Sequence, residues 1–179
     1  MRPRRTTRGR VPILTLILGL TLSGCSPNSG SVPADKTLAI PADVDSAEFL
    51  DRASQIRAMD LDTALHGLCL LLDGQGSGDF QARLDRLRQR GVVPRSWTVS
   101  AGQTLTKGHL AYMVYQACGV REKGAALTLL GPSRRLCLRE LQYYGMMSEG
   151  GLSAPVTGME YVAVLTRADG VRRTGKFPN

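Results

Sequence analysis

The chain has 179 residues, of which 42% are hydrophobic and 21% charged, and its formal net charge is +8. Five of its 23 basic residues and none of its 15 acidic residues fall within the first 24 positions, so the remaining 18 basic and 15 acidic residues leave a net charge of only +3. So mild a charge argues against a nucleic-acid partner. The roughly 155 residues that follow suffice for one domain with a modest core.

The amino terminus has the pattern of an export signal. Arginines at positions 2, 4, 5, 8 and 10 precede an apolar stretch over residues 11–22 that is too short to span a bilayer. The stretch ends in Leu22-Ser23-Gly24-Cys25, which resembles the lipobox of bacterial lipoproteins. The resemblance implies that residues 1–24 are a cleaved lipoprotein signal peptide. Cys25 would then be the new N-terminus, carrying a covalent diacylglycerol and an N-linked acyl chain such as palmitate. An ordinary secretory signal with a chance cysteine is the alternative.

Residues 25–44 are predicted to be this lipidated N-terminus and a flexible tether. Positions 26–34 are rich in Ser, Pro, Gly and Asn and cannot bury a core. Several acyl chains hold a protein on a membrane without crossing it, because each buried methylene contributes about 0.8 kcal/mol. Residue 26 is Ser, whereas Asp at this position retains lipoproteins in the inner membrane of enteric-type bacteria. The resemblance therefore implies an anchor in the outer membrane, facing the periplasm of the cell envelope.

Apolar residues at helical spacing predict six helical segments along the rest of the chain. They are expected after Asp45, from Leu61 to near Gly74, from Phe80 to Gly91, from Thr106 to Gly119, from Ser133 to Gly145, and from Thr157 to about Ala168. Asp45 with Glu48, and Thr157 with Glu160, have the spacing of capping boxes. No segment alternates convincingly as a strand does. The predicted fold is therefore all-α, a small bundle of about six helices over residues 45–170 with a C-terminal tail over residues 171–179.

Two parts of the helical region repeat. Leu84 and Leu87 precede Gly91 by the same offsets at which Leu138 and Leu141 precede Gly145. Two apolar residues follow each glycine, and an irregular loop then leads to a helix that starts at a threonine, Thr106 or Thr157. Residues 60–74 fit the second helix of a more diverged copy. The pattern predicts two to three helix–loop–helix repeats.

These repeats resemble the S-layer homology repeat over roughly residues 60–170. The similar stretches are Gly91-Val92-Val93-Pro94 with Leu105-Thr106-Lys107-Gly108-His109-Leu110-Ala111, and Gly145-Met146-Met147 with Val156-Thr157-Gly158-Met159-Glu160. In that family, three repeats form a pseudo-threefold helical bundle whose grooves bind anionic cell-wall polymers, with a motif arginine as a main contact. Lys107 stands at the arginine position in one unit and Gly158 in the other, and the first unit lacks the motif. At most one groove is therefore expected to keep its cation.

The candidate binding site is the loop and helix start that contain Arg95, Trp97, Lys107 and His109. An aromatic face beside cations is what recognition of a sugar or wall polymer requires. In the other interpretation, Trp97 fixes the loop onto the bundle while Arg95 and Lys107 are solvated. A second basic cluster, formed by Arg134, Arg135 and Arg139, is either a solvated helix face or a contact for phosphate or carboxylate groups.

Three further cysteines remain once Cys25 is assigned to the lipid. Cys69, Cys118 and Cys137 lie in apolar helical runs, which favours small buried core residues, and one disulfide plus one free thiol is the alternative. The chain has no Cys-x-x-Cys pair and no histidine cluster, so no metal site is predicted.

The sequence also lacks a recognisable catalytic motif, and no enzymatic activity and no cofactor other than the covalent lipid are expected. The predicted function is a membrane-anchored lipoprotein with a non-catalytic helical module that binds cell-wall polymer or peptidoglycan. The alternative is a structural or accessory envelope protein whose helical repeats bind a partner protein.

Overall fold

The computed structural model describes residues 45–76, 78–119 and 131–177, all within one compact unit, Val32–Asn179. The predicted signal peptide, Cys25 and the tether lie outside the described residues. The described residues form the helices α1 (Ser46–Ser54), α2 (Leu61–Asp73), α3 (Phe80–Gln89), α4 (Lys107–Cys118), α6 (Arg134–Tyr143) and α7 (Gly158–Thr174). Over these ranges there is no strand, only two isolated bridges, so the all-α prediction with six helices is confirmed.

Each described helix begins at a capping side chain that accepts a hydrogen bond from a backbone N–H of the first turn. The caps are Asp45, Asp60, Asp79, Thr106, Ser133 and Thr157. The expected capping boxes are only half formed, because the glutamates bind elsewhere. Glu48 pairs with Arg52 one turn later, and Glu160 forms an ion pair with Lys107, the first residue of α4. None of the helices in the described part is long and apolar enough to cross a bilayer.

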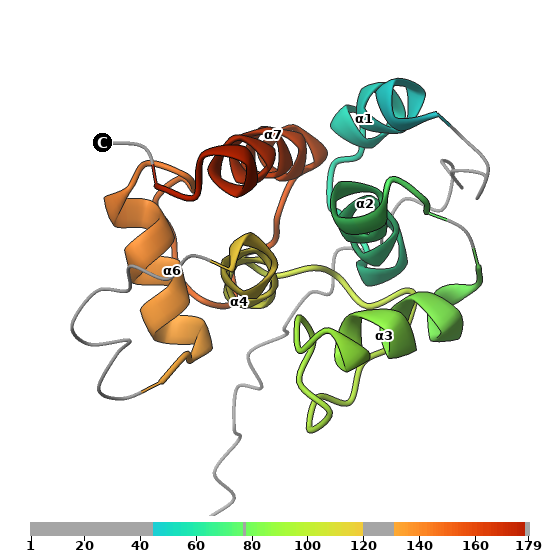
Figure 1. The fold of residues 1–179 in the computed structure, drawn as a ribbon, viewed down its shortest axis with the longest axis horizontal. Helices are drawn as coiled ribbons and strands as arrows, with labels where there is room; N and C mark the ends of the chain where they lie inside the picture. Colours follow the sequence, from blue (N-terminus) through green and yellow to red (C-terminus); the bar gives the residue numbers. More distant parts are fainter. Residues whose placement is uncertain (1–44, 77, 120–130, 178–179) are drawn as a thin grey trace, which may run out of the picture. The chain divides into compact units, whose positions relative to one another are not determined.

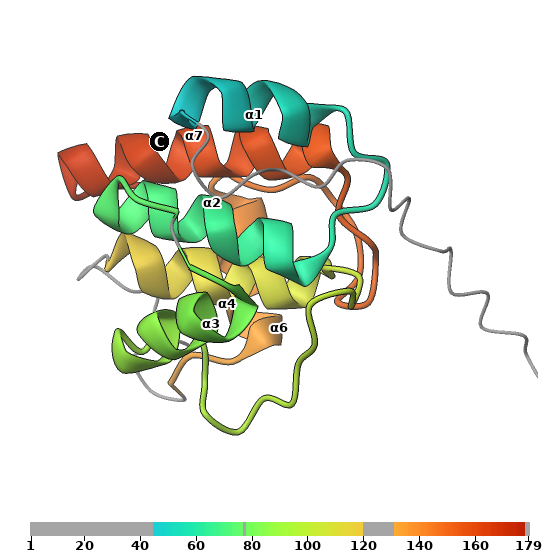
Figure 2. The same cartoon turned by 90° about the vertical axis from the view of Figure 1, so that its right-hand side faces the viewer.

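The helices form two sets, with α2, α4 and α7 in the middle and α1, α3 and α6 around them (Figure 1). Seen from the side, the three inner helices lie next to one another along their lengths (Figure 2). In chain order each outer helix is followed by an inner helix, which gives the units α1–α2, α3–α4 and α6–α7. Each outer helix packs on the inner helix of the preceding unit: α3 on α2, α6 on α4, and α1 on α7. The last of these pairings joins the two ends of the described chain, so the units close into a ring.

Backbone hydrogen bonds just before the inner helices show the same cyclic order. The Met59 N–H donates to the Val156 carbonyl (2.9 Å), the Val156 N–H to the Leu105 carbonyl (3.0 Å), and the Leu105 N–H to the Met59 carbonyl (2.8 Å). Each of these residues immediately precedes an N-cap. The ring therefore has three equivalent helix–loop–helix units, α1–α2, α3–α4 and α6–α7, which is the upper number expected from the sequence.

The core lies where the three units meet, and Tyr161, Tyr115 and Phe49 are among its largest fully buried side chains. The Tyr161 hydroxyl donates to the Ala64 carbonyl over 2.6 Å and so joins α7 to α2. Cys69, Cys118 and Cys137 are all buried, as the first interpretation of the cysteines predicted.

The last helix is longer than the sequence suggested. α7 continues to Thr174, and the predicted end near Ala168 is wrong. Gly170 lies in the interior of the helix, while Gly175 (φ 73°) provides the left-handed cap. Val171 is 2% exposed and Phe177 9%, and the Phe177 ring stacks on Tyr115 of α4 and on Tyr144 at the end of α6. Residues 171–177 of the predicted tail therefore belong to the domain.

Candidate functional site

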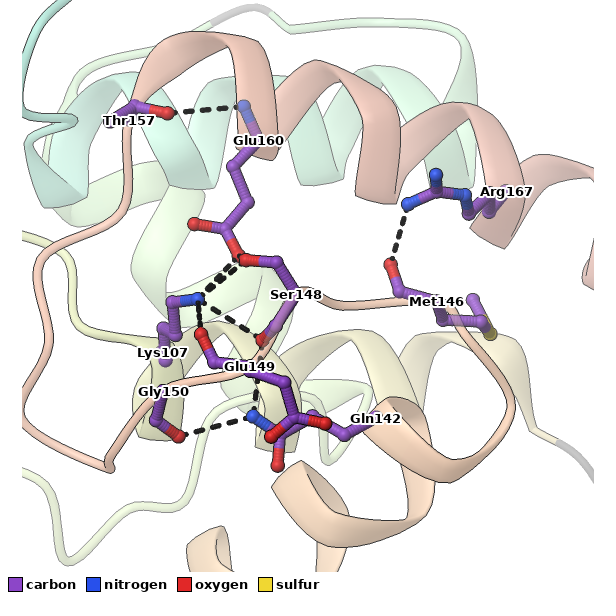
Figure 3. Close-up of polar contacts among 9 residues, drawn as sticks. All are labelled: Lys107, Gln142, Met146, Ser148, Glu149, Gly150, Thr157, Glu160 and Arg167. Carbon is purple, nitrogen blue, oxygen red and sulfur yellow. Dashed lines mark hydrogen bonds and ion pairs between the residues drawn. The ribbon is translucent and has the colours of Figure 1, made fainter.

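Lys107, the predicted groove cation, is the first residue of α4 and only 5% exposed. Its Nζ donates to the Ser148 carbonyl (3.1 Å), the Ser148 Oγ (2.7 Å) and the Glu149 carbonyl (2.7 Å). The same atom lies 2.9 Å from Glu160 Oε1 on α7 (Figure 3). These partners occupy the whole donor capacity of the ammonium group.

The partners of Lys107 are themselves connected. Ser148 Oγ donates to Glu160 Oε1 (2.6 Å), and Gln142 Nε2 donates to the carbonyls of Ser148 and Gly150 (both 3.1 Å; Figure 3). The cluster holds the loop between α6 and α7 against the start of α4. Lys107 therefore lies buried at the junction of the second and third units, whereas both interpretations of the sequence, ligand contact and a solvated side chain, expected it to be exposed.

Gly158 is the residue of the third unit that is equivalent to Lys107, and the packing of the ring requires a glycine there. A Cβ at this residue would lie 1.8 Å from the Ala53 carbonyl oxygen and 2.9 Å from that of Ile56. The start of α7 packs directly on the backbone at the end of α1, and its N–H donates to the Ile56 carbonyl (2.8 Å). No side chain fits here, so a cation at this position is excluded by the closure of the ring.

The aromatic part of the predicted site is assembled at the surface. Trp97 is half-buried, with its ring centroid 4.7 Å from that of His109 and 5.2 Å from that of Tyr112. The guanidinium carbon of Arg134, the exposed first residue of α6, lies 5.8 Å from the Trp97 ring centroid. We call these four residues the Trp97 platform.

Local hydrogen bonds hold the loop that carries Trp97. Its N–H donates to the Pro94 carbonyl (3.2 Å), and its carbonyl accepts from Arg88 Nη2 (2.9 Å). Arg95 is exposed and makes no hydrogen bond or ion pair with the described residues. The structure brings Trp97 and His109 of the candidate site together, whereas Tyr112 and Arg134, which also contact Trp97, were not assigned to the site.

His109 links the platform to the cap of α4. Its Nδ1 lies 3.0 Å from Thr106 Oγ1, and its Nε2 lies 3.1 Å from Arg134 Nη1. A guanidinium group can only donate, so Nε2 accepts and the single proton of the neutral ring is on Nδ1, directed at Thr106. Burial, and then the charge of Arg134, lower the pKa of His109 below its usual 6.5. His109 is therefore a neutral spacer and Arg134 is the cation of the platform.

The domain should lose stability as the pH falls from about 7.5 toward 5.5. The pKa of His109 is lower in the folded than in the unfolded chain, so its contribution is present above 6.5 and is lost as the pH falls through the lowered value. His66, whose pKa is lowered mainly by burial and then by Arg83, acts in the same direction. Between these two pH values, the free energy of unfolding in urea should fall less for His109→Asn than for the wild type, because asparagine does not titrate. A variant that loses as much stability as the wild type would contradict the assignment.

The two other junctions between an inner helix and the next outer helix carry different residues from the junction of α4 and α6, where the Trp97 platform lies. Counting from the N-caps, the residues equivalent to His109, Tyr112 and Arg134 are Thr63, His66 and Phe80 between α2 and α3, and Glu160, Ala163 and Ser46 between α7 and α1. His66, which takes the place of Tyr112, is only 3% exposed and stacks on Phe49. Among the described residues, only the junction of α4 and α6 combines a half-exposed tryptophan with a cation over its ring.

Comparison of the chain with protein families, with curated proteins and with solved structures yields no match. Within residues 45–76, 78–119 and 131–177, no group of three or more His, Cys, Asp and Glu side chains is placed to hold a metal ion. The geometry of the site is therefore the basis for a functional proposal.

Proposed function

We propose that this protein is a lipid-anchored protein of the bacterial envelope whose helical ring binds an anionic cell-wall polymer. The anchor is the lipidated Cys25, in the outer membrane and facing the periplasm, and the binding surface is the Trp97 platform. The ring has no enzymatic role in this proposal, and its only prosthetic group is the covalent lipid.

The observation that carries the proposal is the position of Arg134 over a half-exposed Trp97. An indole face packs well against the apolar face of a sugar ring, and a guanidinium group binds carboxylate or phosphate in a bidentate manner. Arg95 in the same loop adds a second exposed cation. Aromatic stacking and two positive charges match a polymer of sugars that carries negative groups.

The closed ring of three units also supports the proposal, because the S-layer homology repeat, which the sequence resembles, forms such a bundle. The proposed contact differs from that of the family. The motif position of the second unit is the buried Lys107 and that of the third is Gly158. The ligand would therefore meet the loop before α4 and the start of α6.

Removal of the platform should abolish co-sedimentation with purified sacculi. Trp97→Ala should weaken binding by about 2 kcal/mol, or roughly 30-fold, as expected for a central aromatic contact. Arg134→Ala should weaken it less at high salt than at low salt, because charge attraction is screened. Arg139→Ala, another exposed arginine of α6, is the matched control and should bind as the wild type does. Failure of the wild-type mature chain to pellet with sacculi at low salt would refute the polymer-binding proposal.

Cys25→Ser should release the protein from membranes. Without the thiol there is no site for diacylglycerol, and the contribution of about 0.8 kcal/mol per buried methylene is lost. Detergent phase partitioning of cell extracts, with mass spectrometry of the N-terminal peptide, measures both effects. Ser23→Ala keeps a small residue in the lipobox and should remain lipidated. A Cys25→Ser protein that still partitions with the detergent would contradict the anchor.

A further inference from the structure

A groove of about 350 Å³ lies between α1, α2 and α7, at the junction that closes the ring. Its apolar lining includes Leu50 of α1, Leu70 and Leu71 of α2, and Leu165 of α7. The first three are half-buried and leave apolar surface in contact with solvent. Ser46, the first residue of α1, lines the same groove, so the chain enters the described domain at its edge.

The segment that precedes α1 is suited to this groove. Residues 38–44 contain three large apolar side chains, Leu38, Ile40 and Val44, in contrast to the Ser-, Pro- and Gly-rich stretch 26–34. The segment ends at Asp45, the N-cap of α1 and the neighbour of Ser46. A short extended chain therefore spans the distance from the helix start to the groove.

The second unit shows where such a segment packs. Gly76, just before the N-cap Asp79 of α3, is buried against α2 so closely that a Cβ would lie 2.1 Å from His66 Nε2. Arg83 donates to the carbonyls of Gly76 and Gly78 and fixes this segment on α2. In the first unit, the N-cap equivalent to Asp79 is Asp45, and the inner helix on which α1 packs is α7. By the cyclic arrangement, the surface that corresponds to this part of α2 is on α7, which also lines the groove.

We infer that residues 38–44 bind in the groove between α1, α2 and α7 of the same chain, with Ile40 against Leu70 and Leu71. The docking itself does not depend on the proposed function, but one consequence rests on the proposed anchor. With residues 38–44 bound, only residues 26–37 separate the lipid from the domain. The maximum reach then falls from about 65 Å to about 40 Å, at about 3.4 Å per residue.

The isoleucine content of the chain permits a direct test. Between residues 25 and 179, isoleucine occurs only at positions 40 and 56. Methyl NMR of the mature chain carrying Cys25→Ser therefore gives two isoleucine δ1 signals, which Ile40→Val assigns. The buried Ile56 is the internal control for a folded domain. The Ile40 methyl group should show cross-peaks to leucine methyl groups that disappear in Leu70→Ala or Leu71→Ala.

A random-coil position of the Ile40 methyl signal, without cross-peaks to these leucines, would overturn the inference. Cross-peaks found only between differently labelled chains would also overturn it, because a second copy would then fill the groove. A thermal double-mutant cycle gives an independent measurement: Ile40→Ala should lower the Tm by about 3 °C in the wild type and by less than half of that in Leu71→Ala. Val32→Ala, upstream of the segment, should change nothing. The Trp97 platform is intact in all these variants, so sacculus binding separates a failure here from a failure of the proposed function.

Discussion

Replacing Gly158 by alanine should destabilise the domain by about 3 kcal/mol or more, which is the upper end of the range for overpacking a tight contact. The added methyl group would lie 1.8 Å from the Ala53 carbonyl oxygen. The contacted atom belongs to the backbone at the end of α1, and backbone cannot rotate away as a flexible side chain does. α7 would have to move away from α1, and this movement breaks the hydrogen bond from the Gly158 N–H to the Ile56 carbonyl. Urea unfolding followed by circular dichroism measures the change.

Gly170→Ala is the matched control for this prediction. Gly170 lies in the same helix, and a Cβ there would meet nothing within 4 Å. This substitution should stabilise the domain by up to about 1 kcal/mol, because glycine is a poor helix former. If both alanine variants were equally stable, the close approach of α7 to α1 would not exist in solution.

Replacing Lys107 by methionine should destabilise the domain by about 3 kcal/mol. Removal of one partner of a buried ion pair leaves the other charge without compensation, at a cost of about 3–5 kcal/mol. The lower end applies because the Glu160 side chain is still 15% exposed and can recover some hydration. The carbonyls of Ser148 and Glu149 lose their donor as well. The free energy of unfolding from urea titration gives the magnitude.

The second half of this test removes the charge of Glu160. Glu160→Gln in the Lys107→Met background should restore part of the lost stability, since no unpaired carboxylate then remains. Lys176→Met, at an exposed position, should change the free energy of unfolding by no more than about 0.5 kcal/mol. A Lys107→Met variant as stable as Lys176→Met would show that Lys107 is solvated, and Lys107 would again be a candidate for ligand contact.

Local signals predicted most of the secondary structure. Helix starts were found because N-caps such as Thr106 and Thr157 act within one turn, and helix lengths because apolar residues recur every three to four positions. The exception was the end of α7. The sequence indicated an end near Ala168, but the helix continues to Thr174, and the residues beyond Ala168 include the buried Val171 and Phe177, whose ring stacks on Tyr144.

The candidate site depended on contacts between units, which local signals do not contain. Thr157 and Glu160 have the spacing of a capping box, yet Glu160 binds Lys107 from another unit. Lys107 was expected to be exposed, as a ligand contact or a solvated side chain, because its partners Ser148 and Glu149 follow much later in the chain. Arg134 was placed in a separate basic cluster for the same reason, although it lies over Trp97. The spacing of the motifs in the sequence identified candidate residues. Which of their side chains contact one another depends on the closure of the three units into a ring.

The hydrogen bonds that link Met59, Leu105 and Val156 into a cycle have a consequence for how this domain can change over evolution. In an open array of repeats, each repeat contacts only its neighbours, and copies can be added or removed at the ends. Here the first and last units are neighbours of each other, so the array has no free end. A fourth copy would have no place to insert, and loss of one copy would leave two unpaired faces. The number of units in this ring is therefore set by its closure.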